Sequence, residues 1–200
     1  THPFFPSNII TSFHRYRFIF LNLNFASLFL KISCLHAFIL HMNTLSSVGW
    51  LHTIAGTVAI FIGVYLVIKF KVISSKSNLG TIYLILTTVT AATSLMIFNN
   101  GGFNLAHLLG IFALLGVFLG LLFEHKEFFG LSKYFQAICY TGTMLCHLIP
   151  GISEVFTRFP PSQPIANSIF DPILLVSFGI FFLIFLITVL FQIRHLKNNS

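Results

Sequence analysis

The stretch FNLAHLLGIFALLGVFLGLLF, residues 103–123, contains no Lys, Arg, Asp or Glu. A helix rises 1.5 Å per residue, so about 20 such residues cross the hydrocarbon core of a bilayer, which is about 30 Å thick. A strand of a membrane barrel would alternate apolar and polar residues, and this stretch does not alternate. Because backbone groups in lipid must be satisfied within their own segment, residues 103–123 predict a membrane-spanning α-helix.

Four more runs without charged residues flank this one, at residues 47–68, 79–98, 134–149 and 172–193. The run at 134–149 is the shortest and needs flanking residues to span. Hydrophobic residues make up 56% of the chain and charged residues only 8%, whereas a soluble domain has about 25% charged residues. So few charges cannot cover a folded surface. We therefore predict an all-α, polytopic transmembrane helix bundle with five spans in residues 42–200.

The N-terminal segment is a separate problem. Residues 18–40 are apolar enough to form a sixth span, but Lys31 lies near the centre of this run, where a lysine costs about 2.5–3.5 kcal/mol. The chain begins with Thr, and Met42 stands just before the first charge-free run. We expect residues 1–41 to be an extension upstream of a natural start at Met42, with a weak extra span as the alternative.

Lys and Arg concentrate in alternate connections between the charge-free runs. The connections after the first and third runs and the C-terminal tail carry Lys69, Lys71, Lys76, Lys126, Lys133, Arg194 and Lys197. The positive-inside rule places these parts, and with them the C-terminus, in the cytoplasm. The prediction is a multi-pass protein of a bacterial cytoplasmic membrane. The net charge of +7 follows from this orientation, so the expected partner is the lipid bilayer and not nucleic acid.

Two predicted helices carry polar side chains along one face. The spacing i, i+4, i+7, i+11 places such residues on the same side of a helix. The residues are Tyr83, Thr87, Thr90 and Ser94 in one run, and Gln136, Tyr140, Thr143 and His147 in another. Polar groups avoid lipid, so both faces are expected to point into the bundle. They could be hydrogen-bonded contacts between helices or a polar path through the bundle.

Small residues mark two further faces. His52, Gly56, Ala59 and Gly63 repeat the same spacing in the first run. The third run contains a GxxxG pattern at Gly116 and Gly120. Small residues let helix backbones approach closely. The pattern could therefore serve packing within the chain, or it could bind a second copy or a larger membrane complex.

Three histidines, His52, His107 and His147, come from three different runs. Counted from the expected ends of these runs, each lies about 6 Å below the outer boundary, so we expect them to share one level. Neutral imidazole can ligate haem iron or a divalent metal, or transfer protons. The sequence favours a simple hydrogen-bonding role for these histidines and leaves the cofactor undetermined. Haem b or a divalent metal is one alternative, and a proton or substrate path is another. The outer polar residues on the same side are Asn99, Asn100, Glu154 and Arg158.

Several motifs together resemble the DUF2306-type family, which comprises uncharacterised bacterial multi-spanning membrane proteins. The resemblance covers roughly residues 48–160. Its motifs are Trp50-Leu51-His52 with Gly56, Gly63 and Lys69, then Gly80-x-x-Tyr83, His107, and His147-Leu148-Ile149-Pro150-Gly151 leading to Glu154, Thr157, Arg158 and Pro160. The family has His-Arg before G-x-x-Y, and here Lys76-Ser77-Asn78 stands there. The resemblance implies a helical membrane bundle and brings no activity with it.

The chain contains no G-x-S-x-G and no phosphate-binding Gly-rich loop, so the sequence does not decide whether it is an enzyme. The leading hypothesis is a membrane protein with an outward-facing histidine and polar site that binds haem or a metal as a redox accessory. The alternatives are a small proton or solute transporter that uses the two polar faces, and a scaffold subunit of a membrane complex that uses the GxxxG face.

Overall fold

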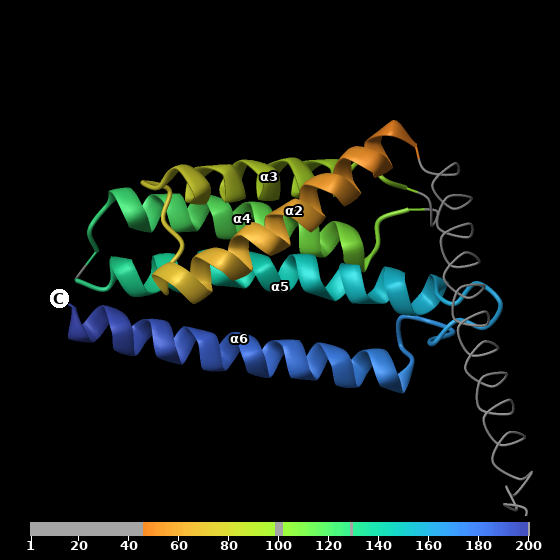
Figure 1. The fold of residues 1–200 in the computed structure, drawn as a ribbon. Coiled ribbons are helices and arrows are strands. Elements are labelled where there is room, and N and C mark those ends of the chain that lie inside the picture. The colour runs from red at the N-terminus through yellow and green to blue at the C-terminus, as the bar shows by residue number, and fades with distance from the viewer. Residues whose placement is uncertain (1–45, 99–101, 129, 200) are drawn as a thin grey trace, which may run out of the picture. The chain divides into compact units, whose positions relative to one another are not determined.

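The computed structural model describes residues 46–98, 102–128 and 130–199. The described residues form helices and no strand. The helices are α2 (Ser47–Phe70), α3 (Asn78–Ser94), α4 (Leu105–His125), α5 (Ser132–Arg158) and α6 (Pro172–Asn198), shown in Figure 1. The chain divides into two units, and the described residues all belong to the second, Leu45–Ser200. The expected sixth span at 18–40 lies outside the described residues.

Polar side chains cap the N-termini of four of these helices. Ser46, Ser77, Asn104 and Asp171 each accept a hydrogen bond from a backbone N–H of the first turn of α2, α3, α4 and α6. Such caps satisfy backbone donors that have no partner within the helix. At α5 the N-cap position is Leu131, whose side chain cannot accept a hydrogen bond. The helix starts are therefore encoded locally, in short polar residues directly before the apolar runs.

Helices α2, α3, α4 and α5 form a closed ring of contacts, in which each helix packs against the next and α5 packs back against α2. In Figure 1, α2 runs obliquely across the other helices of the ring. Helix α6 packs against α5. We call the end of the bundle with the α2–α3 and α4–α5 connections the lysine end, because it carries Lys69, Lys76 and Lys126. The opposite end, where α2 and α4 begin, is the histidine end.

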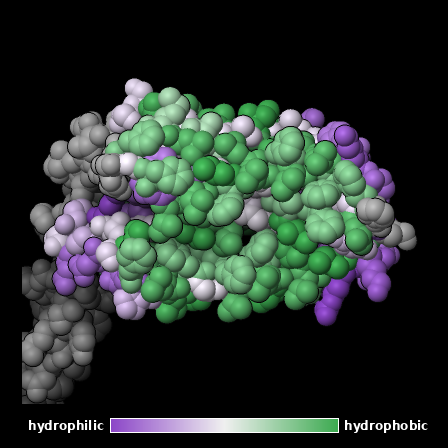
Figure 2. Space-filling view, turned by 180° about the vertical axis from the view of Figure 1, so that it is seen from behind, coloured by the Kyte–Doolittle hydropathy of each residue, from purple (hydrophilic) through white to green (hydrophobic). Residues whose placement is uncertain are grey.

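The outside of this bundle is apolar. Large hydrophobic side chains are exposed on several helices, for example Phe61 (71% exposed), Phe118 (62%) and Leu183 (58%). Figure 2 shows one face, on which hydrophobic side chains cover the middle and hydrophilic ones gather at the two ends. Monomeric soluble proteins rarely expose such large apolar patches. Helices α2, α4 and α6 are long and apolar enough to cross a membrane, which agrees with the predicted membrane class.

Helix α5 differs from the prediction. We expected its apolar run to end at Ile149 and a loop to begin at Gly151, but the helix continues to Arg158 with Pro150 inside it. Proline removes one backbone hydrogen bond and does not always end a helix. Beyond the proline, the Ser153 hydroxyl donates to the Ile149 carbonyl oxygen at 2.8 Å. The helix therefore reaches well past the predicted boundary of the span.

Candidate functional site

The two polar faces meet in the interior of the bundle, as their spacing predicts. Tyr83 and Thr87 of α3 and Tyr140 of α5 have no exposed surface, and Thr143 is 1% exposed. Thr90 and His147 are also buried. Since α3 and α5 are not neighbours in the ring, these side chains meet across its middle. We call this set of buried side chains the polar row.

Glycines on α2 and α4 make room for the polar row. A Cβ at Gly63 of α2 would lie 2.8 Å from the Tyr83 ring, and one at Gly120 of α4 would lie 2.3 Å from the Tyr140 ring. A Cβ at Gly116 would lie 2.8 Å from Cγ2 of Thr143. The GxxxG face of α4 is thus filled by α5 of the same chain. The scaffold hypothesis required this face to bind another protein, and the face is already occupied by α5.

A hydroxyl pair forms the centre of the row. The Tyr83 Oη and Thr143 Oγ1 atoms are 2.6 Å apart. Thr143 also donates to the backbone carbonyl oxygen of Tyr140 at 2.7 Å. Burying a hydroxyl without a partner is costly, so these bonds hold α3 and α5 in one register.

Glu124, the last-turn carboxylate of α4, closes the row at the lysine end. The Tyr140 hydroxyl donates to Glu124 Oε2 at 2.9 Å. The Ser75 N–H lies 3.0 Å from both carboxylate oxygens, and the Ser74 hydroxyl donates to Oε1. The sequence prediction missed Glu124, because the residue directly follows the charge-free run 103–123 and so fell outside the expected span. The signal in the sequence that could have identified Glu124 is its position directly after the apolar run, where the same helix can continue for another turn.

Imidazoles close the row at the histidine end. His147 Nε2 lies 3.2 Å from Thr87 Oγ1. His52 of α2 is half-buried, and its Nδ1 lies 2.9 Å from the Thr90 carbonyl oxygen and 3.3 Å from Thr93 Oγ1. His52 and His147 therefore contact α3 from two different helices, on successive turns.

The expected single level for the three histidines is wrong for His147. Helix α5 ends at Arg158, eleven residues after His147, so this histidine lies farther from the end of its helix than the predicted distance of about 6 Å. The reason is that α5 does not stop at its proline. His107 also stands apart. It lies one turn before Gly110, which meets α3 at Ser94, and its ring contacts Phe98 beyond the end of α3. His52 instead meets α3 at Thr90 and Thr93.

His107 is 1% exposed and lies between two aromatic rings, with centroid distances of 4.8 Å to Phe98 and 5.3 Å to Phe103. Its Nδ1 closes the capping box of α4 with Asn104. Its Nε2 is buried and has no hydrogen-bond partner among the residues that the structure describes. The immediate role of His107 is thus at the start of its own helix.

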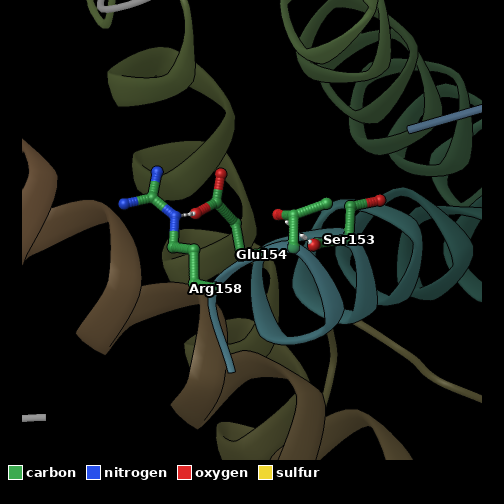
Figure 3. Close-up of polar contacts among 4 residues, drawn as sticks. Ser153, Glu154 and Arg158 are labelled. Carbon is green, nitrogen blue, oxygen red and sulfur yellow. Dashed lines mark hydrogen bonds and ion pairs between the residues drawn. The ribbon is translucent and has the colours of Figure 1, made fainter. Parts of the chain in front are cut away.

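The remaining predicted residues are dispersed. The Ser94 hydroxyl donates to its own helix, at the Ala91 carbonyl oxygen. Gln136 donates to the Ile73 carbonyl oxygen at 3.0 Å, at the lysine end. Glu154 and Arg158 form an ion pair one turn apart on α5, as Figure 3 shows. Asn99 and Asn100 lie outside the described residues.

The buried polar residues that were not predicted include Thr141 of α5 and Gln192 of α6. Gln192 of α6 is 2% exposed. Its amide donates to the Lys71 carbonyl oxygen at 2.8 Å, and its carbonyl oxygen accepts from the Thr141 hydroxyl at 2.9 Å. The signal that could have found Gln192 is a lone amide in an otherwise apolar helix, since such a group needs partners inside the protein.

The described part of the chain contains no group of three or more His, Cys, Asp or Glu residues that could hold a metal ion. No family model, curated protein or solved structure matches the chain. The resemblance to the DUF2306-type family accordingly stays an expectation from the quoted motifs.

Proposed function

We propose that this chain is a multi-spanning membrane protein that transfers protons along the polar row between its two ends. The observation that carries the proposal is a series of hydroxyl and imidazole groups inside the ring, buried except for His52, that leads to the half-buried carboxylate of Glu124. The series runs from His52 and His147 past Tyr83 and Thr143 to Glu124. Hydroxyl and imidazole groups both donate and accept hydrogen bonds, which is what a proton path requires.

The bonded groups advance along α3 and α5 by about one helical turn at a time. The proposed path requires water molecules that bridge these turns, and a polar lining with enough room can hold such water. Ionisable groups inside membrane bundles are costly and commonly mark such paths. The haem or metal hypothesis has less support, because the described residues bring no three His, Cys, Asp or Glu side chains together and His107 belongs to the capping box of α4.

In the proposed arrangement all five helices cross the membrane. Of the eight Lys and Arg residues between positions 46 and 199, seven are at the lysine end and only Arg158 is at the histidine end. By the positive-inside rule, the lysine end and the C-terminus face the cytoplasm of a bacterial cell. Assembly of the chain into a homo-oligomer or a larger membrane complex stays a prediction from the sequence.

Proton uptake into proteoliposomes tests the proposal. Purified protein is reconstituted with a pH-sensitive dye inside the vesicles, and a potassium diffusion potential drives uptake. We expect Tyr83→Phe and Thr143→Val to lower the rate at least tenfold, because each removes one hydroxyl of the 2.6 Å pair and about 1.4 kcal/mol on the barrier corresponds to tenfold.

Thr188→Val is the matched control. Within the described part of the chain, the Thr188 hydroxyl on α6 bonds only to the Ile184 carbonyl oxygen of its own helix, so the same chemical change should leave the rate unaltered. Wild-type vesicles that take up protons no faster than empty vesicles would refute the proposed function. Equal losses in all three variants would show that the effect is not specific to the row.

A further inference from the structure

The lysine end of the polar row is covered by the connection between α2 and α3, residues 71–77. Three helices hold this connection through side chains. Gln192 of α6 donates to the Lys71 carbonyl oxygen, Gln136 of α5 donates to the Ile73 carbonyl oxygen, and Glu124 of α4 accepts from Ser74 and Ser75. A surface loop is not normally tied in this way.

The connection is also tightly packed. The Ile73 side chain has no exposed surface. A Cβ at Gly80, in the first turn of α3, would lie 1.9 Å from the Ser74 carbonyl oxygen, so α3 begins directly against the connection. Residues 71–77 are therefore a fitted cover over Glu124 and Tyr140.

The hydrogen bonds of Glu124 all suit a carboxylate. Its two oxygens accept from the Ser74 hydroxyl, the Ser75 N–H and the Tyr140 hydroxyl. A protonated carboxyl carries its own O–H and has less capacity to accept. Protonation would thus weaken the bonds that attach the cover to α4, while the two glutamine bonds would remain.

We propose that Glu124 is the proton-exchanging residue at the lysine end of the row, and that residues 71–77 are the cover that must loosen when it takes up a proton. This inference rests on the proposed function and names the residue that would regulate the same path. The titratable side chain in contact with the carboxylate is Tyr140 of α5. Charged or titratable groups also lie on the neighbouring segments. They are Lys71 and Lys76 of the cover, His125, Lys126 and Glu127, which directly follow Glu124 in the sequence, and Lys133 and Tyr134 of α5.

Labelling with dicyclohexylcarbodiimide in proteoliposomes tests this inference. A protonated carboxyl adds to the carbodiimide carbon, its proton moves to a carbodiimide nitrogen, and the acyl group then migrates to nitrogen, so the whole reagent is retained as an N-acylurea. The reagent is lipid-soluble and reacts with protonated carboxyls in apolar surroundings. Peptide mass spectrometry then measures the modified fraction at Glu124 and at exposed Glu127, which is the internal control.

Because the Ser74, Ser75 and Tyr140 bonds favour the carboxylate form of Glu124, we expect slower labelling at Glu124 than at exposed Glu127 in the wild-type protein. Labelling of both should become faster as the pH falls. Gln136→Leu and Gln192→Leu should each accelerate labelling at Glu124 about fivefold, since each removes one buried hydrogen bond of about 1 kcal/mol from the cover. The labelling at Glu127 should not change. Labelling at Glu124 that is as fast as at Glu127 in the wild-type protein, or that both glutamine variants leave unaltered, would overturn the inference.

Proton uptake by Glu124→Gln separates this inference from the proposed function. We expect a loss of at least tenfold in rate with the amide, which keeps the shape of the carboxyl and cannot exchange a proton. If Glu124→Gln retains the wild-type rate while Tyr83→Phe does not, the path stands and the role of Glu124 is refuted. If wild-type vesicles show no uptake, the proposed function fails, and the labelling of the wild-type protein alone decides whether Glu124 is a covered, protonatable carboxyl.

Discussion

Gly120 shows at the scale of single residues how the interior of this protein is built. The residue faces the Tyr140 ring, and a Cβ there would lie 2.3 Å from the nearest ring atom. The same ring carries the hydroxyl that bonds Glu124. The absence of a side chain at Gly120 thus gives the Tyr140 ring the space in which its hydroxyl reaches Glu124. Helix packing and the candidate site therefore depend on the same contact.

Gly120→Ala should therefore destabilise the protein. The added methyl group forces the Tyr140 ring to move, and overpacking of this kind costs about 1–3 kcal/mol. A lower midpoint of thermal unfolding, followed by circular dichroism in detergent micelles, would show the loss. Gly179→Ala on α6 is the control, because a Cβ there meets nothing within 4 Å and alanine favours a helix by up to about 1 kcal/mol. A Gly120→Ala protein as stable as Gly179→Ala would contradict this account.

At the scale of the elements, each helix combines a local start signal with a face chosen by its neighbours. Helix α4 is the clearest case. Asn104 accepts a hydrogen bond from the Ala106 N–H at 2.9 Å, and His107 completes the capping box. Its glycine face then packs on α5. The histidine that suggested a cofactor thus has a structural role at the start of the helix.

Asn104→Ala should destabilise α4. Loss of the cap leaves backbone donors of the first turn unpaired, at a cost of about 0.5–2 kcal/mol. Thermal unfolding followed by circular dichroism is again the measurement. Asn78→Ala is the matched control, since Asn78 lies at an exposed position in the first turn of α3, where Ser77 provides the cap. Equal stability of the two variants would show that the cap of α4 contributes nothing.

At the scale of the whole molecule, the bundle has polar groups on its axis and hydrophobic side chains on its outside. The buried hydroxyls and imidazoles lie between α3 and α5, while side chains such as Phe61 and Leu183 are exposed. This distribution is stable where lipid surrounds the helices, because exposed apolar side chains then cost nothing and buried polar groups find partners inside.

Cysteine accessibility tests whether all five helices cross the membrane. After replacement of the three native cysteines, single cysteines are placed at Lys76, Gly102, Lys126 and Ser162, one in each connection. A membrane-impermeant thiol reagent applied to intact cells should label positions 102 and 162 only. Lysed cells should label all four. Labelling of positions 76 and 102 from the same side would show that α3 does not cross, and the proposed path would then not join two compartments.

Composition and periodicity alone establish the helical class, the apolar runs, and the inward direction of the polar faces on α3 and α5. These properties are local, because hydrophobicity and a repeat of 3.6 residues can be read along one segment. They do not establish which faces meet. The end of α5 beyond Pro150, the position of Glu124 under residues 71–77 and the separation of His107 from His52 depend on contacts between segments that are far apart in the chain. Side chains from different helices decide those contacts together, so only the tertiary structure shows them.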